Sequence, residues 1–245
     1  MKVNTSILIP ARLMSTRFPR KPLALINGIP MVICCAKNAI KTGLPVYVCT
    51  DSEEIKSVCE SYFVNVILTP ECNSGTDRVA IAINQIETDY VINLQGDEPL
   101  IGSDSLNKIV SMLSILETKE NSIISGVEPI NSQEALDLNE AKCALIQGNT
   151  KIQYLSRQPL INNVEGSSEP VYFKQLGLYA FSVESLKKFA SLPVGKLEKG
   201  EGLELLRGLE NEFTIFSCII NDNTTSVDTQ SDLNKVISKI NKKIL

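Results

Sequence analysis

The stretch Ser6–Pro22, SILIPARLMSTRFPRKP, decides the fold and opens the candidate site. Its first residues, Ser6–Ile9, form a short β-rich run without charge, which is typical of a strand buried on both faces. A polar loop over 11–27 follows this strand. The next pattern predicts a helix over 30–42, opened by a proline and ended by Gly43 as its C-cap. The stretch therefore begins a strand–loop–helix unit.

The same alternation continues through the first half of the chain. Strands are predicted at 46–49, 65–69 and 90–94, and helices are predicted to begin at Asp51 or Ser52, at Thr76, and at Ser103 or Asp104. Continuous apolar strands that alternate with helices indicate βαβ units, because each strand must be covered on both faces. We therefore predict an α/β fold with a mostly parallel central sheet.

The second half has a different pattern. It predicts a hairpin of strands 141–147 and 152–155 around Gly148–Asn149, a loop at 165–170, a strand at 171–181, helices at 183–190 and 197–209, a strand at 213–220 and a helix at 232–240. With no long linker, we expect one domain, 1–245, of two lobes around one cleft. The first lobe is expected at about 1–130 and the second at about 131–225, with 226–245 returning to the first.

Charge and histidine content exclude several function classes. The 245 residues carry 24 basic and 28 acidic side chains, a net charge of -4, which argues against a nucleic-acid or polybasic membrane binder. A small anionic ligand needs only a local basic cluster. The absence of histidine excludes Ser-His-Asp and Cys-His catalysis and imidazole metal ligands. Any metal must therefore be held by oxygen or sulfur.

Cysteine spacing and hydropathy indicate a cytoplasmic protein without membrane insertion. None of the seven cysteines forms a CxxC pair, so zinc and thioredoxin-type sites have no support and reduced, buried thiols are expected. The first apolar run has only four residues, too few for a signal peptide, and no stretch approaches the ~20 apolar residues of a membrane span.

The loop after the first strand is the first candidate site. It carries Arg12, Arg17, Arg20 and Lys21 within ten residues. Guanidinium forks bind oxygens in pairs and an ammonium adds a point charge, so the loop suits a polyphosphate. The alternative is a solvated basic loop, and composition alone favours it.

Two further loops follow at predicted strand ends, where open α/β sheets bind ligands. Asp97, within Gln95–Pro99, suits a magnesium site, or else it caps backbone amides in a tight turn. The segment Ser74–Arg78 lies at a loop-to-helix junction, where amides accept anions. Thr76 is alternatively no more than an N-cap.

Taken in order, these segments resemble a known family. The motifs are ILIPARLMSTRFPRKPL, SGTDR, NLQGDEPLI, YLSR at 154–157, KQLGLY at 174–179, LEKGEGLE at 197–204 and VDTQSDL at 227–233. This order, over essentially the whole chain, resembles the 3-deoxy-manno-octulosonate (Kdo) cytidylyltransferases, or CMP-Kdo synthetases. The first loop and QGDEP are the most specific of these motifs.

The resemblance implies a Rossmann-like nucleotidyltransferase with a smaller mixed α/β dimerisation lobe. Its reaction couples CTP to a Kdo-type sugar acid, giving a CMP-sugar acid and pyrophosphate, by attack of the anomeric hydroxyl on the α-phosphorus. The family implies that Arg12, Ser15 and Lys21 hold the triphosphate with support from Arg17, that Ser74, Gly75 and Arg78 contact cytidine, that Asp97 and Asp228 bind Mg²⁺, and that Gln95, Arg157, Gln175 and Glu204 lie on the sugar side. It also implies a homodimer and a product used for lipopolysaccharide or capsule.

The assignment of Asp228 as a metal ligand depends on the resemblance more than any other assignment does. It lies between a predicted strand and a predicted helix, where an aspartate usually serves as an N-cap, and that interpretation is favoured without the family. The match of its segment to the VDT motif reverses the preference.

Three positions depart from the family pattern. Arg20 replaces a glycine, Gln175 replaces the histidine of a KHxGxY motif, and Leu205 replaces the glutamine of LEQLR. A site that hydrogen-bonds its substrate discriminates strongly, so changes at 175 and 205 are expected to alter which sugar fits. The acceptor is then a modified Kdo, such as 8-amino-Kdo, or another keto-deoxy sugar acid; the alternative is neutral drift with Kdo retained.

Other classes fit less well. A pyrophosphorylase acting on a sugar 1-phosphate normally has a Gly-rich first loop, and a GT-A glycosyltransferase normally has a DxD motif, which this chain lacks. A non-catalytic nucleotide-binding relic is disfavoured, because the basic loop and both candidate metal aspartates are present together.

Overall fold

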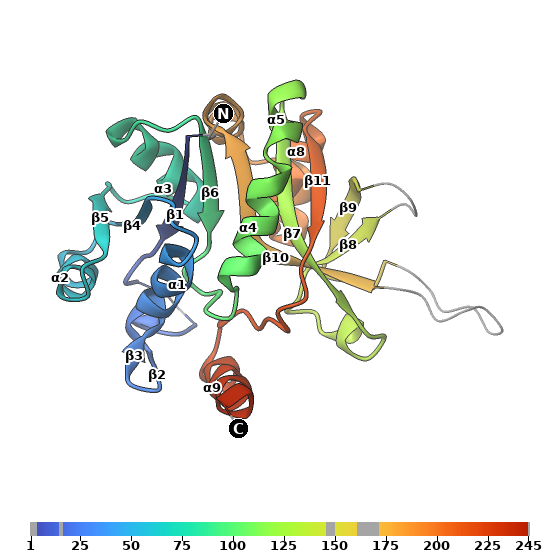
Figure 1. The fold of residues 1–245 in the computed structure, drawn as a ribbon. Helices are drawn as coiled ribbons and strands as arrows, with labels where there is room; N and C mark the ends of the chain where they lie inside the picture. Colours follow the sequence, from blue (N-terminus) through green and yellow to red (C-terminus); the bar gives the residue numbers. More distant parts are fainter. Residues whose placement is uncertain (1–3, 15–16, 146–149, 161–171, 245) are drawn as a thin grey trace. The chain divides into compact units, whose positions relative to one another are not determined.

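A computed structural model describes residues 4–14, 17–145, 150–160 and 172–244 (Figure 1). The chain forms two compact units. The first unit comprises Met1–Lys108 and Asp222–Leu245, and the second comprises Ile109–Asn221. The sequence had placed these limits near 130 and 225. Among the described residues, no helix has the length and apolar character needed to cross a membrane.

The first unit contains the predicted parallel sheet. Its strands are β1 (Thr5–Pro10), β4 (Val46–Thr50), β5 (Asn65–Leu68) and β6 (Tyr90–Leu94). They lie in the order β5-β4-β1-β6, and each neighbouring pair is parallel. Every residue of β1 is buried, as its uncharged apolar sequence predicts. The carboxyl ends of β1, β4 and β6 therefore open on the same edge of the sheet.

Helices follow these strands as predicted. They are α1 (Met31–Ile40), α2 (Glu53–Ser61), α3 (Gly75–Ala82) with the 3-10 turn η2 (Ile83–Gln85), and α4 (Ser103–Met112). Gly43, past the end of α1, has a φ of +77°, in agreement with the predicted C-cap region. Of the two candidate caps for α2, Ser52 accepts the hydrogen bond from the Ile55 amide. Asp51 is therefore available for another contact.

A small hairpin in the loop after β1 was not predicted. Strands β2 (Leu25–Ile26) and β3 (Ile29–Pro30) pair antiparallel across Asn27–Gly28, after the 3-10 turn η1 (Lys21–Leu23). Both turn residues have positive φ, +48° and +84°. Asn-Gly is the preferred sequence for such a two-residue turn, so the signal was present in the sequence.

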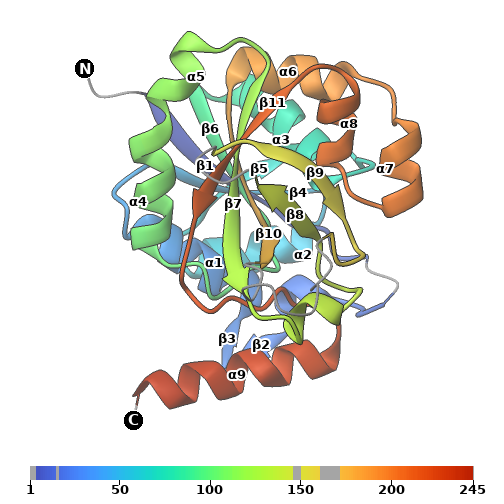
Figure 2. The same cartoon turned by 90° about the vertical axis from the view of Figure 1, so that its right-hand side faces the viewer.

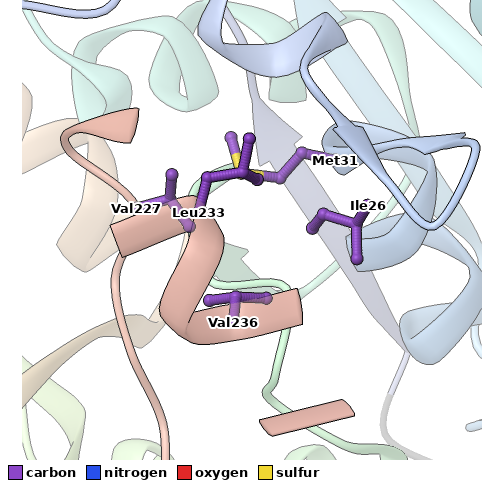
Figure 3. Packing of buried hydrophobic residues seen from close by; sticks show 5 residues of the cluster. All are labelled: Ile26, Met31, Val227, Leu233 and Val236. Atoms are coloured by element: carbon purple, nitrogen blue, oxygen red, sulfur yellow. The ribbon is translucent and has the colours of Figure 1, made fainter. Parts of the chain in front are cut away.

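The C-terminal helix α9 (Gln230–Ile244) belongs to the first unit and packs on this hairpin region. Figure 3 shows the contact, in which Val227, Leu233 and Val236 lie against Ile26 and Met31. The apolar residues at 233 and 236 are three positions apart, as expected for one buried helix face. This packing returns the segment that carries Asp228 to the loop that carries Lys21.

The second unit is a mixed α/β unit (Figure 2). Its elements are α5 (Ser114–Thr118), β7 (Ser122–Ile130), η3 (Glu134–Leu136), β8 (Lys142–Leu145), β9 (Ile152–Ser156), β10 (Tyr172–Ser182), α6 (Val183–Ser191), α7 (Lys196–Glu201), α8 (Leu205–Glu210) and β11 (Thr214–Ile219). Strand β7 pairs parallel with β11 and antiparallel with β10, whose other described neighbour within this unit is β8. Strands β8 and β9 form the predicted hairpin.

Two features of the second unit differ from the prediction. Strand β7 was not predicted, although its Ser122–Val127 portion is β-rich. The single helix expected over 197–209 is two short helices, because Gly202 adopts a φ of +65° and ends α7. The hairpin turn at 146–149 and the loop at 165–170 lie outside the described residues.

Candidate active site

A cavity of about 270 Å³ opens in the first unit where the loops after β1 and β6 meet the start of α3. The predicted site residues that line it are Arg12, Arg17, Lys21, Ser74, Gly75, Arg78, Gln95, Asp97 and Asp228. These residues come from four separate segments of the sequence. Ser15, the remaining predicted triphosphate contact, lies outside the described residues.

Lys21 joins the two predicted metal ligands. Its Nζ donates to Asp97 Oδ2 at 2.7 Å and to Asp228 Oδ1 at 3.1 Å. Arg17 Nη1 lies 3.0 Å from the other oxygen of Asp228, Oδ2. The Lys21 side chain is only 16% exposed, whereas Asp97 and Asp228 are 26% and 30% exposed. Two cations and two carboxylates thus meet at one wall of the cavity.

The surroundings of Lys21 keep it charged. Burial alone would lower the pKa of its ammonium, but attraction and hydrogen bonds from Asp97 and Asp228 outweigh burial and raise the pKa above its usual value. Lys21 is therefore a fixed positive charge at neutral pH rather than a base.

The contacts at the start of α9 show which side chain caps this helix. At the start of α9, Asp232 accepts the Thr229 amide at 3.0 Å, and Thr229 Oγ1 accepts the Asp232 amide at 3.3 Å. This pair caps the helix, so the Asp228 carboxylate is left for Lys21 and Arg17. Asp97 likewise directs its carboxylate to Lys21.

Backbone contacts fix the two aspartate segments together. The Val227 amide donates to the Asp97 carbonyl at 3.0 Å. Gly96, beside Asp97, approaches β1 so closely that a Cβ would lie 2.9 Å from the Pro10 carbonyl oxygen. That contact is with backbone, which cannot move aside, so the QGDEP turn requires glycine at this position.

Arg78 lines the cavity, but its side chain is almost fully buried and is held by protein groups. It is 2% exposed, and its guanidinium donates to Asp51 Oδ2 at 2.7 Å and to Thr69 Oγ1 at 2.6 Å. Arg12, Asp51, Thr69, Cys72 and Arg78 are among the residues that line an adjoining cavity of about 610 Å³ in the same unit. Sequence reasoning considered Asp51 only as a helix cap and missed this pairing.

The start of α3 is built by a short polar network. Ser74 is the N-cap and accepts the Asp77 amide at 3.1 Å, so Thr76 is not the cap. Thr76 instead accepts from Asn93 Nδ2 at 3.0 Å, and Asn93 Oδ1 accepts from Gln95 Nε2 at 3.2 Å. This chain orients Gln95.

Gly75 lies directly under the Gln95 amide. A Cβ on Gly75 would meet Gln95 Oε1 at 2.7 Å. A side chain at position 75 would therefore displace the Gln95 amide.

Arg20, where the resemblance implies glycine, has a left-handed backbone conformation. Its φ is +58°, in the left-handed region that glycine adopts without strain. In this chain the guanidinium forms an ion pair with Glu54 on α2. Arg20 therefore anchors the loop to α2 and does not line the cavity that holds Lys21.

The remaining predicted sugar-side residues belong to the second unit. The Arg157 guanidinium donates to the carbonyl oxygens of Asn139 and Glu201 at 2.8 and 3.1 Å, and its amide donates to Glu201 Oε2. Glu204 is the N-cap residue of α8. Leu205 is fully buried, which argues against the expected contact between its side chain and a sugar.

Gln175 has an unusual hydrogen-bonding environment on β10. Its Nε2 donates to Tyr179 Oη at 2.8 Å. Its Oε1 is shielded from solvent and accepts no hydrogen bond from the described residues. A buried carbonyl without a donor is costly.

Sulfur chemistry has no support at the site. All seven cysteines are free thiols, and five of them are buried, as predicted. Cys72 lines both cavities, and burial raises the pKa of its thiol, with nearby Arg78 opposing that effect. Among the described residues, no three acidic or cysteine side chains gather to hold a metal. A metal here would thus need oxygens from its substrate besides Asp97 and Asp228.

The chain is similar to known proteins over most of its length. The cytidylyltransferase family model matches residues 6–215. Curated proteins of Shewanella baltica (strain OS155) and Shewanella halifaxensis, both named 8-amino-3,8-dideoxy-manno-octulosonate cytidylyltransferase, are 39% and 40% identical over 95% and 94% of this chain, and over 97% and 96% of their own lengths.

A solved structure is similar along its whole length. It is that of a CMP:2-keto-3-deoxy-manno-octonic acid synthetase complexed with CTP, with a TM-score of 0.89 and 28% identity over 98% of this chain and 99% of that one. This match confirms the predicted α/β nucleotidyltransferase fold. The chain therefore belongs to the 3-deoxy-manno-octulosonate cytidylyltransferase family.

Proposed function

We propose that this enzyme couples CTP to a Kdo-type sugar acid and that its preferred acceptor is 8-amino-Kdo. The anomeric hydroxyl oxygen bonds to the α-phosphorus while the bond from that phosphorus to the α,β-bridging oxygen breaks. Pyrophosphate leaves, the hydroxyl proton passes to water, and the CMP-sugar acid remains. Such a transfer depends on positioning and charge stabilisation rather than on a protein nucleophile, which fits a chain without histidine.

The cavity of the first unit provides the nucleotide site. Arg12, Ser15, Arg17 and Lys21 hold the triphosphate, and Ser74, Gly75 and Arg78 contact cytidine. The fixed charge of Lys21 and its position on the cavity wall support the first assignment. Arg78 acts on the nucleotide from within its pairing with Asp51, so its role is to shape the pocket as much as to donate to the base.

Magnesium fits Asp97 and Asp228. One ammonium reaches an oxygen of each carboxylate, so the two carboxylates face the same part of the cavity wall. Mg²⁺ binds carboxylate oxygens at about 2.0–2.1 Å and fills its remaining positions with water and phosphate oxygens. When bound, it would neutralise charge on the reacting phosphates and orient the sugar hydroxyl and carboxylate.

The acceptor assignment is carried by Gln175. Its Oε1 is a hydrogen-bond acceptor only, and it is buried without a donor from the described residues. The protonated amine of 8-amino-Kdo is a donor only, so the two groups are complementary. The relatives named for 8-amino-3,8-dideoxy-manno-octulosonate support the same acceptor. Gln95, Arg157 and Glu204 complete the sugar side, with Arg157 as the partner of the sugar carboxylate.

The oligomeric state, the compartment and the use of the product are also proposed from the family. We expect a homodimer in the cytoplasm, where CTP is available, and a product destined for lipopolysaccharide. Light scattering after size exclusion tests the dimer, and a monomeric mass would contradict it. The net charge of -4 supports a small-molecule partner rather than nucleic acid.

Pyrophosphate release tests the reaction and the acceptor together. The enzyme is incubated with CTP, Mg²⁺ and one acceptor of a panel: Kdo, 8-amino-Kdo, a nonulosonic acid or a sugar 1-phosphate. We expect the fastest release with 8-amino-Kdo. Equal or faster release with Kdo would contradict the acceptor assignment, and release only with a sugar 1-phosphate would contradict the reaction itself.

A further inference from the structure

Lys21 bonds to the same two carboxylates that are proposed to bind magnesium. Its Nζ is 2.7 Å from Asp97 Oδ2 and 3.1 Å from Asp228 Oδ1. Arg17 lies 3.0 Å from Asp228 Oδ2, so both oxygens of Asp228 have a cationic partner. The position that a cation bridging Asp97 and Asp228 would take is therefore next to an ammonium.

An ammonium and a divalent cation cannot share this position. Both are positive, and both bind the same carboxylate lone pairs, the metal at about 2.0–2.1 Å. The low exposure of the Lys21 side chain, 16%, limits the screening of their repulsion by water. A divalent cation must therefore displace the ammonium from at least one aspartate.

The phosphates of the proposed substrate are a second set of anionic partners for Lys21. It lines the cavity together with Arg12 and Arg17, where the triphosphate is proposed to bind. A lysine ammonium sits on a flexible four-carbon stem, so it can turn to another anion without movement of the backbone. Phosphate oxygens would then replace the carboxylates as the hydrogen-bond partners of Lys21 and Arg17. The two carboxylates would be free to bind the metal.

We propose that Lys21 is an internal counter-ion that closes the Asp97–Asp228 pair to divalent cations until a nucleoside triphosphate draws its ammonium away. This inference rests on the proposed metal site and extends it. Metal and nucleotide then bind with positive coupling, and the coupling is reciprocal. In the absence of nucleotide, the two aspartates bind a divalent cation weakly, although both carboxylates are in place.

The test measures Mn²⁺ binding in the absence of nucleotide. Electron paramagnetic resonance detects the free ion, and the bound fraction follows by difference. Lys21→Met removes the competing charge and keeps a long side chain. We expect it to bind Mn²⁺ on the order of tenfold more tightly than the unaltered enzyme, a typical coupling strength. Lys21→Gln, which stays polar but is uncharged, should show the same direction and serves if the methionine variant folds poorly.

Two controls locate the effect. Lys41→Met removes an exposed lysine at the end of α1, which bonds only to Asn38 among the described residues, and should leave Mn²⁺ binding unchanged. Adding Asp97→Asn to Lys21→Met should abolish the gain. Mn²⁺ affinity in Lys21→Met and Lys21→Gln that equals or falls below that of the unaltered enzyme would overturn the proposal, as would a gain that survives Asp97→Asn. No acceptor is present, so either result leaves the sugar assignment independent.

Discussion

The two units differ in how their polar side chains are used. In the first unit, Lys21, Arg17, Asp97 and Asp228 bond to one another at the wall of a cavity. In the second, Arg157 is held by protein carbonyls. Nucleotidyl transfer requires an array of charges around the reacting phosphates, whereas the choice of a sugar depends on a few hydrogen bonds. The nucleotide chemistry is therefore expected to tolerate little change, and the acceptor choice to be altered by single residues.

The largest effect is expected from the first unit. Asp97→Asn should reduce turnover on the order of 10²- to 10³-fold, because one of the two carboxylates proposed to hold Mg²⁺ beside the reacting phosphates is lost. CTP binding, measured by calorimetry, should change far less. Asp89→Asn, at an exposed position outside the cavity, serves as the control. Unchanged turnover in Asp97→Asn would contradict the proposed role of Asp97 in the reaction.

Gln175→His tests the second unit and restores the family residue. We expect the ratio of kcat/KM for 8-amino-Kdo to kcat/KM for Kdo to fall on the order of tenfold, because one hydrogen-bond partner of the substrate is lost. The KM for CTP should stay the same, which separates this role from a general structural one. Gln153→His, at an exposed position on β9, is the matched control. A change in the KM for CTP with a constant acceptor ratio would contradict the division between the units.

Asp51→Asn should affect both nucleotide binding and stability. It leaves the buried Arg78 guanidinium without its charged partner, which costs about 1–3 kcal/mol of unfolding free energy. The KM for CTP should rise several-fold, since Arg78 and Asp51 both line the adjoining cavity. Chemical denaturation and steady-state kinetics check the two effects. A loss of stability with an unchanged KM would show that the pair is structural only.

The smallest effect is expected at the cap of α9. Burial alone would raise the pKa of Asp232, but hydrogen bonds from Thr229 and Lys235 lower it below the usual 3.8. Its stabilising effect is thus complete above that value and is lost as the pH falls below it. Asp232→Asn should cost about 0.3–1 kcal/mol, because a negative charge near the N-terminus of the helix is lost, which corresponds to a fall of about 1–4 °C in Tm at pH 7. The difference from the unaltered protein should shrink in thermal melts at pH 3, and a constant difference would contradict the role of the charge.

The sequence predicted the first unit better than the second for physical reasons. Strands such as β1 and helices such as α1 are defined by local patterns, and their ends place the loops that carry Arg12 and Asp97. The capping role of Asp232 rather than Asp228 depends on which oxygen reaches which amide, and this is not local information. The pairing of Asp51 with Arg78 joins residues 27 positions apart.

In the second unit the pattern itself was ambiguous. The helix break at Gly202 and the missed strand β7 both lie where short elements follow one another closely. The family pattern identified Arg157 and Gln175 as site candidates, but the hydrogen-bond partners of the Arg157 guanidinium lie 18 and 44 positions away in the sequence.

Direct competition between acceptors tests the central claim of this account. The enzyme receives equal concentrations of Kdo and 8-amino-Kdo with limiting CTP and Mg²⁺, and mass spectrometry measures the ratio of the two CMP-sugar acids. We predict an excess of the 8-amino product in the unaltered enzyme and a smaller excess in Gln175→His. An equal or larger amount of CMP-Kdo from the unaltered enzyme would contradict the assignment of Gln175 and of the acceptor.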